Sequence, residues 1–351
     1  MKSLALKLAF SLLIGAAMMA YALRGMNHDA ALALGQSPSE ALLGAVTSFS
    51  PWVIAGYALT FLAVHVARLL RWVLVVDSLG PARRTDVVAI CAVGFAAIIL
   101  FPLRIGEMVR PYLLSRYSRI SFGAALATAV VERIIDGLCI TGLLFAALAT
   151  APIPPSPVVR SAGWVSLAVF LGASVAIGAF AVQFDLACRL VNGVLGRWAP
   201  GLAQRVVGLM QTFLDGVRVL RAGGNLARFL GLTVVYWSMN ALGMAWLARG
   251  CGLPVPWFGG FGLLSTLVVG LMVPSGPGYL GNFEVALIGG LKLYLPQATL
   301  GATAMALALV QNVVQFAVQV GFGVPFLVKL GLTPRGLVAL TTASQPAAKT
   351  D

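Results

Sequence analysis

The feature that most constrains this chain is a series of apolar runs, each about as long as a bilayer is thick. A transmembrane helix needs about 20 consecutive, mostly apolar residues, and runs of this length stand at Pro51–Val76, Ser121–Ala149 and Thr299–Leu330. Of the 351 residues, 60% are hydrophobic and 10% are charged, whereas a soluble domain carries roughly 25% charged residues. The sequence therefore predicts an all-α, polytopic membrane protein.

The basic residues point to membrane orientation and lipid rather than nucleic acid. The 24 Lys and Arg exceed the 11 Asp and Glu by 13, and no basic run is interleaved with aromatic residues as a nucleic-acid surface requires. The four cysteines are scattered, with neither a disulfide framework nor zinc-ligand spacing, and only two histidines are present. We therefore expect no metal, no cofactor and no nucleic-acid partner.

Six apolar runs are expected to cross the bilayer completely. The first run ends in Ala20-Tyr21-Ala22, which resembles a signal-peptide cleavage site, but the rest of the chain is equally apolar, so we expect an uncleaved first helix. The expected full spans are Leu8–Leu23, Pro51–Val76, Ser121–Ala149, Trp164–Phe184, Phe229–Leu247 and Thr299–Leu330.

Two further apolar segments are short and interrupted, which favours re-entrant hairpins. Residues 87–114 have basic clusters on both sides, so a full crossing would place one cluster outside. Residues 257–295 consist of two short arms around a Pro- and Gly-rich break at Pro274–Gly281. Irregular backbone at membrane depth survives only in protein or beside a wet cavity. Two hairpins entering from opposite faces predict an inverted repeat with a site near the midplane.

The distribution of basic residues predicts a bacterial cytoplasmic (inner) membrane protein with both termini in the cytoplasm. This arrangement leaves Arg24, Arg160, Arg249 and Lys292 outside and Arg133 within a span, so that 19 of the 24 basic residues are cytoplasmic or in the first hairpin. Residues 185–228 should form an amphipathic segment on the inner surface. We expect one membrane domain over residues 1–335 and a disordered cytoplasmic tail over 336–351.

Charged residues inside an apolar run indicate a functional site. Glu132, Arg133 and Asp136 lie near the middle of the span that begins at Ser121, where a charge costs about 3 kcal/mol or more unless it finds a partner or water. One interpretation is a substrate or proton path. The other is an internal ion-pair cluster, in which arginines neutralise carboxylates; its members would be Arg104, Glu107, Arg110, Glu132, Arg133 and Asp136.

The second interrupted segment and the last span carry the other candidate residues. Glu284 follows Gly278 and Gly281 at the break, and it is either a cap for freed backbone amides or a ligand or proton carrier. Gln311 and Gln315 belong to a stripe of amide side chains, which either joins neighbouring helices or lines a cavity.

Three motifs carry a resemblance to a known family. Pro102-Leu103-Arg104-Ile105-Gly106-Glu107-Met108-Val109-Arg110-Pro111, then Ile120-Ser121, and then Val131-Glu132-Arg133-Ile134-Ile135-Asp136 make the sequence resemble the flippase-like, lysylphosphatidylglycerol-synthase transmembrane-region family over roughly residues 5–330. The break at Pro277–Glu284 is similar to that family's Pro-Gly-Gly-x-Gly-x-x-Glu element, with Tyr279 in place of a usual glycine.

The resemblance implies lipid translocation or lipid modification, in some relatives with a fused soluble aminoacyltransferase domain, which we do not expect here. We expect a lipid flippase or translocase, not an enzyme, which moves a lipid or lipid-linked substrate with an anionic head group, coupled to protons in one version of the hypothesis. Arg104 and Arg110 would bind phosphate, because the guanidinium fork suits it. The alternatives are a membrane-embedded glycosyl- or phosphotransferase acting on a lipid carrier, and an ion-coupled solute transporter.

Overall fold

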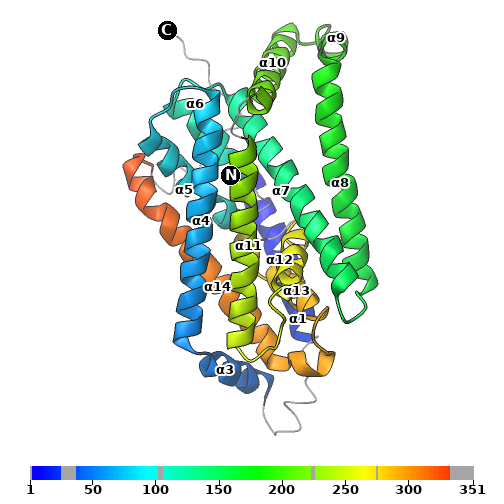
Figure 1. Cartoon of the computed structure of the whole chain (residues 1–351). Helices are drawn as coiled ribbons and strands as arrows, with labels where there is room; N and C mark the ends of the chain where they lie inside the picture. Colours follow the sequence, from blue (N-terminus) through cyan, green and yellow to red (C-terminus); the bar gives the residue numbers. More distant parts are fainter. Residues whose placement is uncertain (1, 25–36, 102–105, 223–225, 274–275, 333–351) are drawn as a thin grey trace.

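The computed structural model describes residues 2–24, 37–101, 106–222, 226–273 and 276–332, and the regular elements of this part of the chain are all helices, without strands (Figure 1). Its helices are α1 (Lys2–Arg24), α3 (Pro38–Ser48), α4 (Pro51–Leu79), α5 (Arg84–Leu100), α6 (Val109–Tyr117), α7 (Phe122–Thr150), α8 (Pro157–Val182), α9 (Phe184–Leu195), α10 (Pro200–Ala222), α11 (Leu226–Gly250), α12 (Gly259–Gly270), η2 (Pro277–Tyr279), α13 (Asn282–Leu291) and α14 (Gln297–Lys329).

The all-α, polytopic membrane architecture expected from the sequence is confirmed. Within the described residues, α4, α8, α11 and α14 are long and apolar enough to cross a membrane by themselves. Their windows of highest hydropathy are at most 44% buried inside the protein, so much of their apolar surface is left for lipid. The 29-residue α7 is as long as α4 but carries the charges Glu132, Arg133 and Asp136. The count of six full spans stays a prediction.

The two interrupted segments lie toward opposite ends of the helical bundle. Figure 1 shows α6 at the same end as α9 and α10, whereas α13 lies toward the end occupied by α3. The two segments also meet, because the Tyr279 hydroxyl in η2 donates a hydrogen bond to the carbonyl of Ile98 in α5 at 3.2 Å. Their entry into the membrane as hairpins, and the inverted repeat, stay predictions.

Two surface elements were not specified by the sequence analysis, and each has a local cause. The polar stretch before Pro51 contains helix α3, whose first turn is closed by a capping box: Glu40 N donates to Ser37 Oγ, and Ser37 N donates to Glu40 Oε2. The segment 185–228 forms two helices, α9 and α10, separated by a turn that begins at Gly196. The tail at 336–351 lies outside the described residues.

Candidate functional site

Three helices bring a buried arginine and two carboxylates together. Arg71 of α4 is 0% exposed, and its guanidinium donates to both oxygens of Asp136 on α7, with Nη1–Oδ1 at 2.6 Å and Nη2–Oδ2 at 2.8 Å. Nη2 also donates to Glu132 Oε1 at 2.6 Å. From α11, the Tyr236 hydroxyl donates to Asp136 Oδ1 at 2.6 Å. These charge-assisted bonds tie α4, α7 and α11 into one unit.

Arg110 is the second buried arginine of this site. It lies in the first turn of α6, and its Nη2 donates to Glu132 Oε2 at 3.2 Å. The guanidinium packs over the Trp72 ring, with 4.6 Å from Cζ to the ring centroid. Although the residue is 1% exposed, Nε and Nη1 have no hydrogen-bond partner among the described residues. Unpaired buried donors cost free energy, so these two nitrogens, which carry three N–H groups, favour an additional acceptor.

The linked residues carry more positive than negative charge. Ion pairs join three arginines, Arg71, Arg110 and Arg133, to the two carboxylates of Glu132 and Asp136. Arg68 and Glu107 lie close enough to interact electrostatically with Arg133. Their charges are opposite, so they do not change the excess of one positive charge. We call Arg71, Arg110, Glu132, Arg133 and Asp136 the arginine–carboxylate cluster; with one surplus cation, it suits an anion.

The structure differs from the sequence interpretation in which arginine binds the two carboxylates most closely. The ion-pair interpretation included Arg133, which does pair with Asp136, but its side chain is 31% exposed and its Nη2 lies 4.0 Å from Asp136 Oδ2. Arg71, which was not among the candidate residues of the sequence interpretation, donates hydrogen bonds to both carboxylates. Because α4 runs on to Leu79, eight residues beyond Arg71, this side chain lies about 12 Å inside the helix end. Arg104 lies outside the described residues.

The remaining candidate residues form a separate polar group. The Glu284 carboxylate caps α13, since Gly281 N donates to Oε2 at 2.6 Å, and it accepts a bond from Asn312 Nδ2 at 3.0 Å. Gly278 and Gly281 have φ of 73° and 86°, in the region that glycine favours. Gln315 Nε2 donates to the Tyr57 hydroxyl at 2.7 Å.

Gln311 is the one residue of this second group whose side chain is fully buried without a partner. It is 0% exposed, and neither its Oε1 nor its Nε2 has a hydrogen-bond partner in the described chain. No hydrogen bond or ion pair between described residues joins Glu284, Gln311 or Gln315 to the arginine–carboxylate cluster. In the described chain these three candidates are therefore not bonded directly to the arginine–carboxylate cluster.

By its class, this protein is a helical membrane protein. It has a buried cluster with net positive charge where α4, α6, α7 and α11 meet. The family model described as the lysylphosphatidylglycerol synthase TM region matches residues 5–323, and the chain belongs to that family. The resemblance noted in the sequence is thus confirmed. This membership connects the chain with a lipid-related membrane role.

The chain is also similar to a protein named glycosyltransferase AglD from Haloferax volcanii. The two are 25% identical over 345 residues, which cover 89% of this chain and 53% of the relative. The chain therefore spans about half the length of that relative. No solved structure matches the sequence.

The placement of Arg110 depends on a glycine, and this yields a prediction. A methyl group at Gly94 of α5 would overlap Cγ and crowd Cδ of Arg110. We expect Gly94→Ala to lower the free energy of unfolding by about 1–3 kcal/mol, as overpacking does. Thermal unfolding measures this effect. Gly94→Ala should lower the free energy of unfolding by less in an Arg110→Ala background, where the overlapping atoms are absent, so the effects of the two substitutions should not be additive. Gly172→Ala, which has open space within 4 Å, is the matched control; equal costs in both Arg110 backgrounds would contradict the packing argument.

Proposed function

We propose that this protein is a lipid translocase that moves a lipid or lipid-linked substrate with an anionic head group between leaflets of the cytoplasmic membrane. The observation that carries the proposal is Arg110, a buried arginine with two unpaired nitrogens in a cluster with surplus positive charge. A phosphate oxygen would accept these donors in charge-assisted hydrogen bonds. Glu132 and Asp136 would balance the guanidinium groups when no substrate is bound.

The membrane setting supports a lipid rather than a soluble anion as the substrate. The cluster is formed by helices whose outer surfaces are apolar: Leu70 of α4 is 50% exposed and Val234 of α11 is 65% exposed. Hydrocarbon chains can stay against such surfaces while the head group enters the polar interior. Family membership supports the same substrate class. Coupling of transport to protons through the carboxylates is a further part of this proposal.

Neutralising Arg110 tests the proposal. We expect Arg110→Gln to slow the movement of an anionic lipid roughly ten- to a hundredfold, because a hydrogen bond to a charged group is worth about 1.5–3 kcal/mol. The measurement is transbilayer movement of fluorescent phosphatidylglycerol and phosphatidylcholine in liposomes that contain the purified protein. Arg84→Gln is the control, since the Arg84 side chain is 79% exposed and its ion pair with Asp77 lies on the surface.

Two results would contradict the proposal. One is an Arg110→Gln variant that remains monodisperse and moves phosphatidylglycerol at the wild-type rate. The other is a wild-type protein that moves neither lipid above the rate of protein-free liposomes when polyprenyl phosphate is also tested.

A second candidate function is a glycosyl- or phosphotransferase that acts on a lipid carrier. The observation that favours it is the name of the relative, a glycosyltransferase. This chain spans about half of that relative, so the shared region need not be the part that transfers sugar. Incubating the purified chain with polyprenyl phosphate and radiolabelled nucleotide sugars separates the candidates: a glycosylated lipid product favours the transferase, and lipid movement without product favours the translocase.

A further inference from the structure

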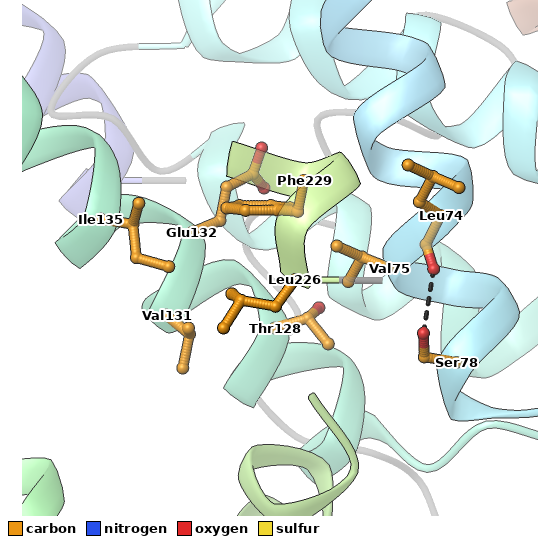
Figure 2. A pocket seen from close by; sticks show the side chains of 9 residues that line it. All are labelled: Leu74, Val75, Ser78, Thr128, Val131, Glu132, Ile135, Leu226 and Phe229. Atoms are coloured by element: carbon orange, nitrogen blue, oxygen red, sulfur yellow. Dashed lines mark hydrogen bonds between the residues drawn. The ribbon is translucent and has the colours of Figure 1, made fainter. Parts of the chain in front are cut away.

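A small cavity adjoins the arginine–carboxylate cluster. It has a volume of about 40 Å³ and lies between α4, α7 and the start of α11 (Figure 2). Since roughly 10–15 Å³ on this scale admits one water molecule, the cavity has room for a few methylene groups. The residues that line it are Leu74, Val75, Ser78, Thr128, Val131, Glu132, Ile135, Leu226 and Phe229.

The walls of this cavity suit hydrocarbon better than water. Both hydroxyl groups bond to their own helices: Ser78 Oγ donates to Leu74 O at 3.1 Å, drawn as the dashed line in Figure 2, and Thr128 Oγ1 donates to Ala125 O at 2.7 Å. The Glu132 carboxylate accepts from Arg71 and Arg110. A buried water needs two to four polar partners, and the polar groups of these walls already have theirs.

Two residues of the cavity wall also contact the arginines of the proposed head-group site. Glu132 lines the cavity and pairs with Arg110, the arginine with unpaired donors. The Phe229 ring lines the cavity, and its centroid lies 4.8 Å from Cζ of Arg71. At the rim, Leu226 is 48% exposed. A ligand with an anionic end at Arg110 could therefore place the carbons next to that end in the cavity and continue past Leu226.

We propose that this cavity binds the first carbons of a lipid chain whose anionic head group lies at Arg110. The inference rests on the proposed function and adds to it that the chain is recognised together with the head group. Lipid tails are as apolar as these walls, so leaving the bilayer for the cavity supplies little driving force. The cavity instead positions the lipid. It fixes the place of the first chain carbons and so holds the head group against Arg110.

A pair of tryptophan variants on α4 tests this proposal. Leu74→Trp fills the cavity, whereas Leu70→Trp, one helical turn away, adds the same side chain at a half-exposed position that does not line it. Binding of dioleoyl phosphatidylglycerol to the purified full-length protein is followed by native mass spectrometry. We expect Leu74→Trp to raise Kd about tenfold or more, equivalent to about 1.4 kcal/mol, and Leu70→Trp to leave Kd unchanged. Glycerol phosphate, which has no chain, should bind equally to both variants.

The outcomes separate this proposal from the proposed function. If Leu74→Trp and Leu70→Trp bind the lipid equally while Arg110→Gln loses it, the cavity proposal is wrong and the head-group site stands. If Arg110→Gln binds as wild type while Leu74→Trp loses the lipid, the cavity binds a chain but the head group lies elsewhere. Binding of neither phosphatidylglycerol nor polyprenyl phosphate by wild type would overturn both.

A labelling experiment on the unmodified protein keeps the proposal testable should Leu74→Trp fail to fold. Phosphatidylglycerol with a photoreactive diazirine at the second or third chain carbon should label the cavity walls, chiefly Val131, Ile135 and Leu226. The same lipid with the diazirine at the methyl end should label lipid-facing residues such as Val234. Equal labelling of the cavity by both probes would overturn the proposal.

Discussion

Replacing Arg71 with leucine should destabilise the protein more than any other single change of charge in the described chain. The side chain is 0% exposed and donates four hydrogen bonds, three of them to Glu132 and Asp136 and one to Thr233 Oγ1 at 3.0 Å. Its loss leaves Asp136 buried with one distant cation, and breaking a buried pair from one side costs about 3–5 kcal/mol. Thermal unfolding in detergent and the monodisperse fraction on size exclusion measure the effect.

Two comparisons make the Arg71 prediction specific to burial. Arg84→Leu removes a surface ion pair with Asp77 at 3.5 Å, and such pairs contribute about 0–1 kcal/mol. Combining Arg71→Leu with Asp136→Leu should recover part of the loss, because removing both partners leaves fewer unpaired buried charges. A double variant no more stable than Arg71→Leu, or an Arg71→Leu variant as stable as wild type, would show that the pair is not the cause.

The helical segments were predictable because apolar periodicity and turn chemistry are local properties. The run expected at Ser121–Ala149 corresponds to α7 at Phe122–Thr150, and the run expected at Thr299–Leu330 corresponds to α14 at Gln297–Lys329. That Glu132 and Asp136 on α7 would have buried partners was also predictable, since an apolar run cannot hold them without partners. The capping box at Ser37 and Glu40 was present in the sequence but was not recognised as the start of α3.

The identity of the partners was not predictable, because pairing depends on how distant helices are rotated against one another. Arg71 and Arg133 are both arginines within apolar runs, yet only Arg71 projects between α4, α7 and α11. Arg133 follows Glu132 directly and therefore points about 100° away around α7. Proximity in the sequence pointed to Arg133, whose Nη2 lies 4.0 Å from Asp136 Oδ2, whereas 65 residues separate Asp136 from Arg71.

Tyr279 shows how a departure from the family's glycine pattern is accommodated. It has a positive φ of 55° and is the single non-glycine residue of this kind among those described. Left-handed backbone is strained for a side chain with a Cβ, which explains why glycine suits the position. Here the hydroxyl of Tyr279 bonds to Ile98 O, so the residue links the two interrupted segments. A glycine would relieve the strain and remove that link.

Gly106→Ala, in the turn before α6, is the second single substitution from which we expect a large loss of stability. A methyl group at Gly106 would overlap the carbonyl of Ala97 and crowd the backbone nitrogen of Ile98, both in α5. Backbone atoms cannot rotate away, so Gly106→Ala must separate α5 from the turn that leads into α6. Overpacking typically lowers the free energy of unfolding by roughly 1–3 kcal/mol. We expect the decrease caused by Gly106→Ala to lie at or above the upper end of this range.

Displacement at Gly106 should also reach the proposed head-group site, because Arg110 follows four residues later on α6. We therefore expect Gly106→Ala to lower both the unfolding temperature and the binding of phosphatidylglycerol, measured on the same detergent-purified sample. Gly142→Ala on α7, where nothing lies within 4 Å of the added methyl group, should change neither quantity. If Gly106→Ala matched Gly142→Ala in stability, close backbone packing would not be the reason for glycine at this turn. If only stability fell and binding were retained, the position of Arg110 would depend on its contacts with Gly94 and Trp72 rather than on the turn before α6.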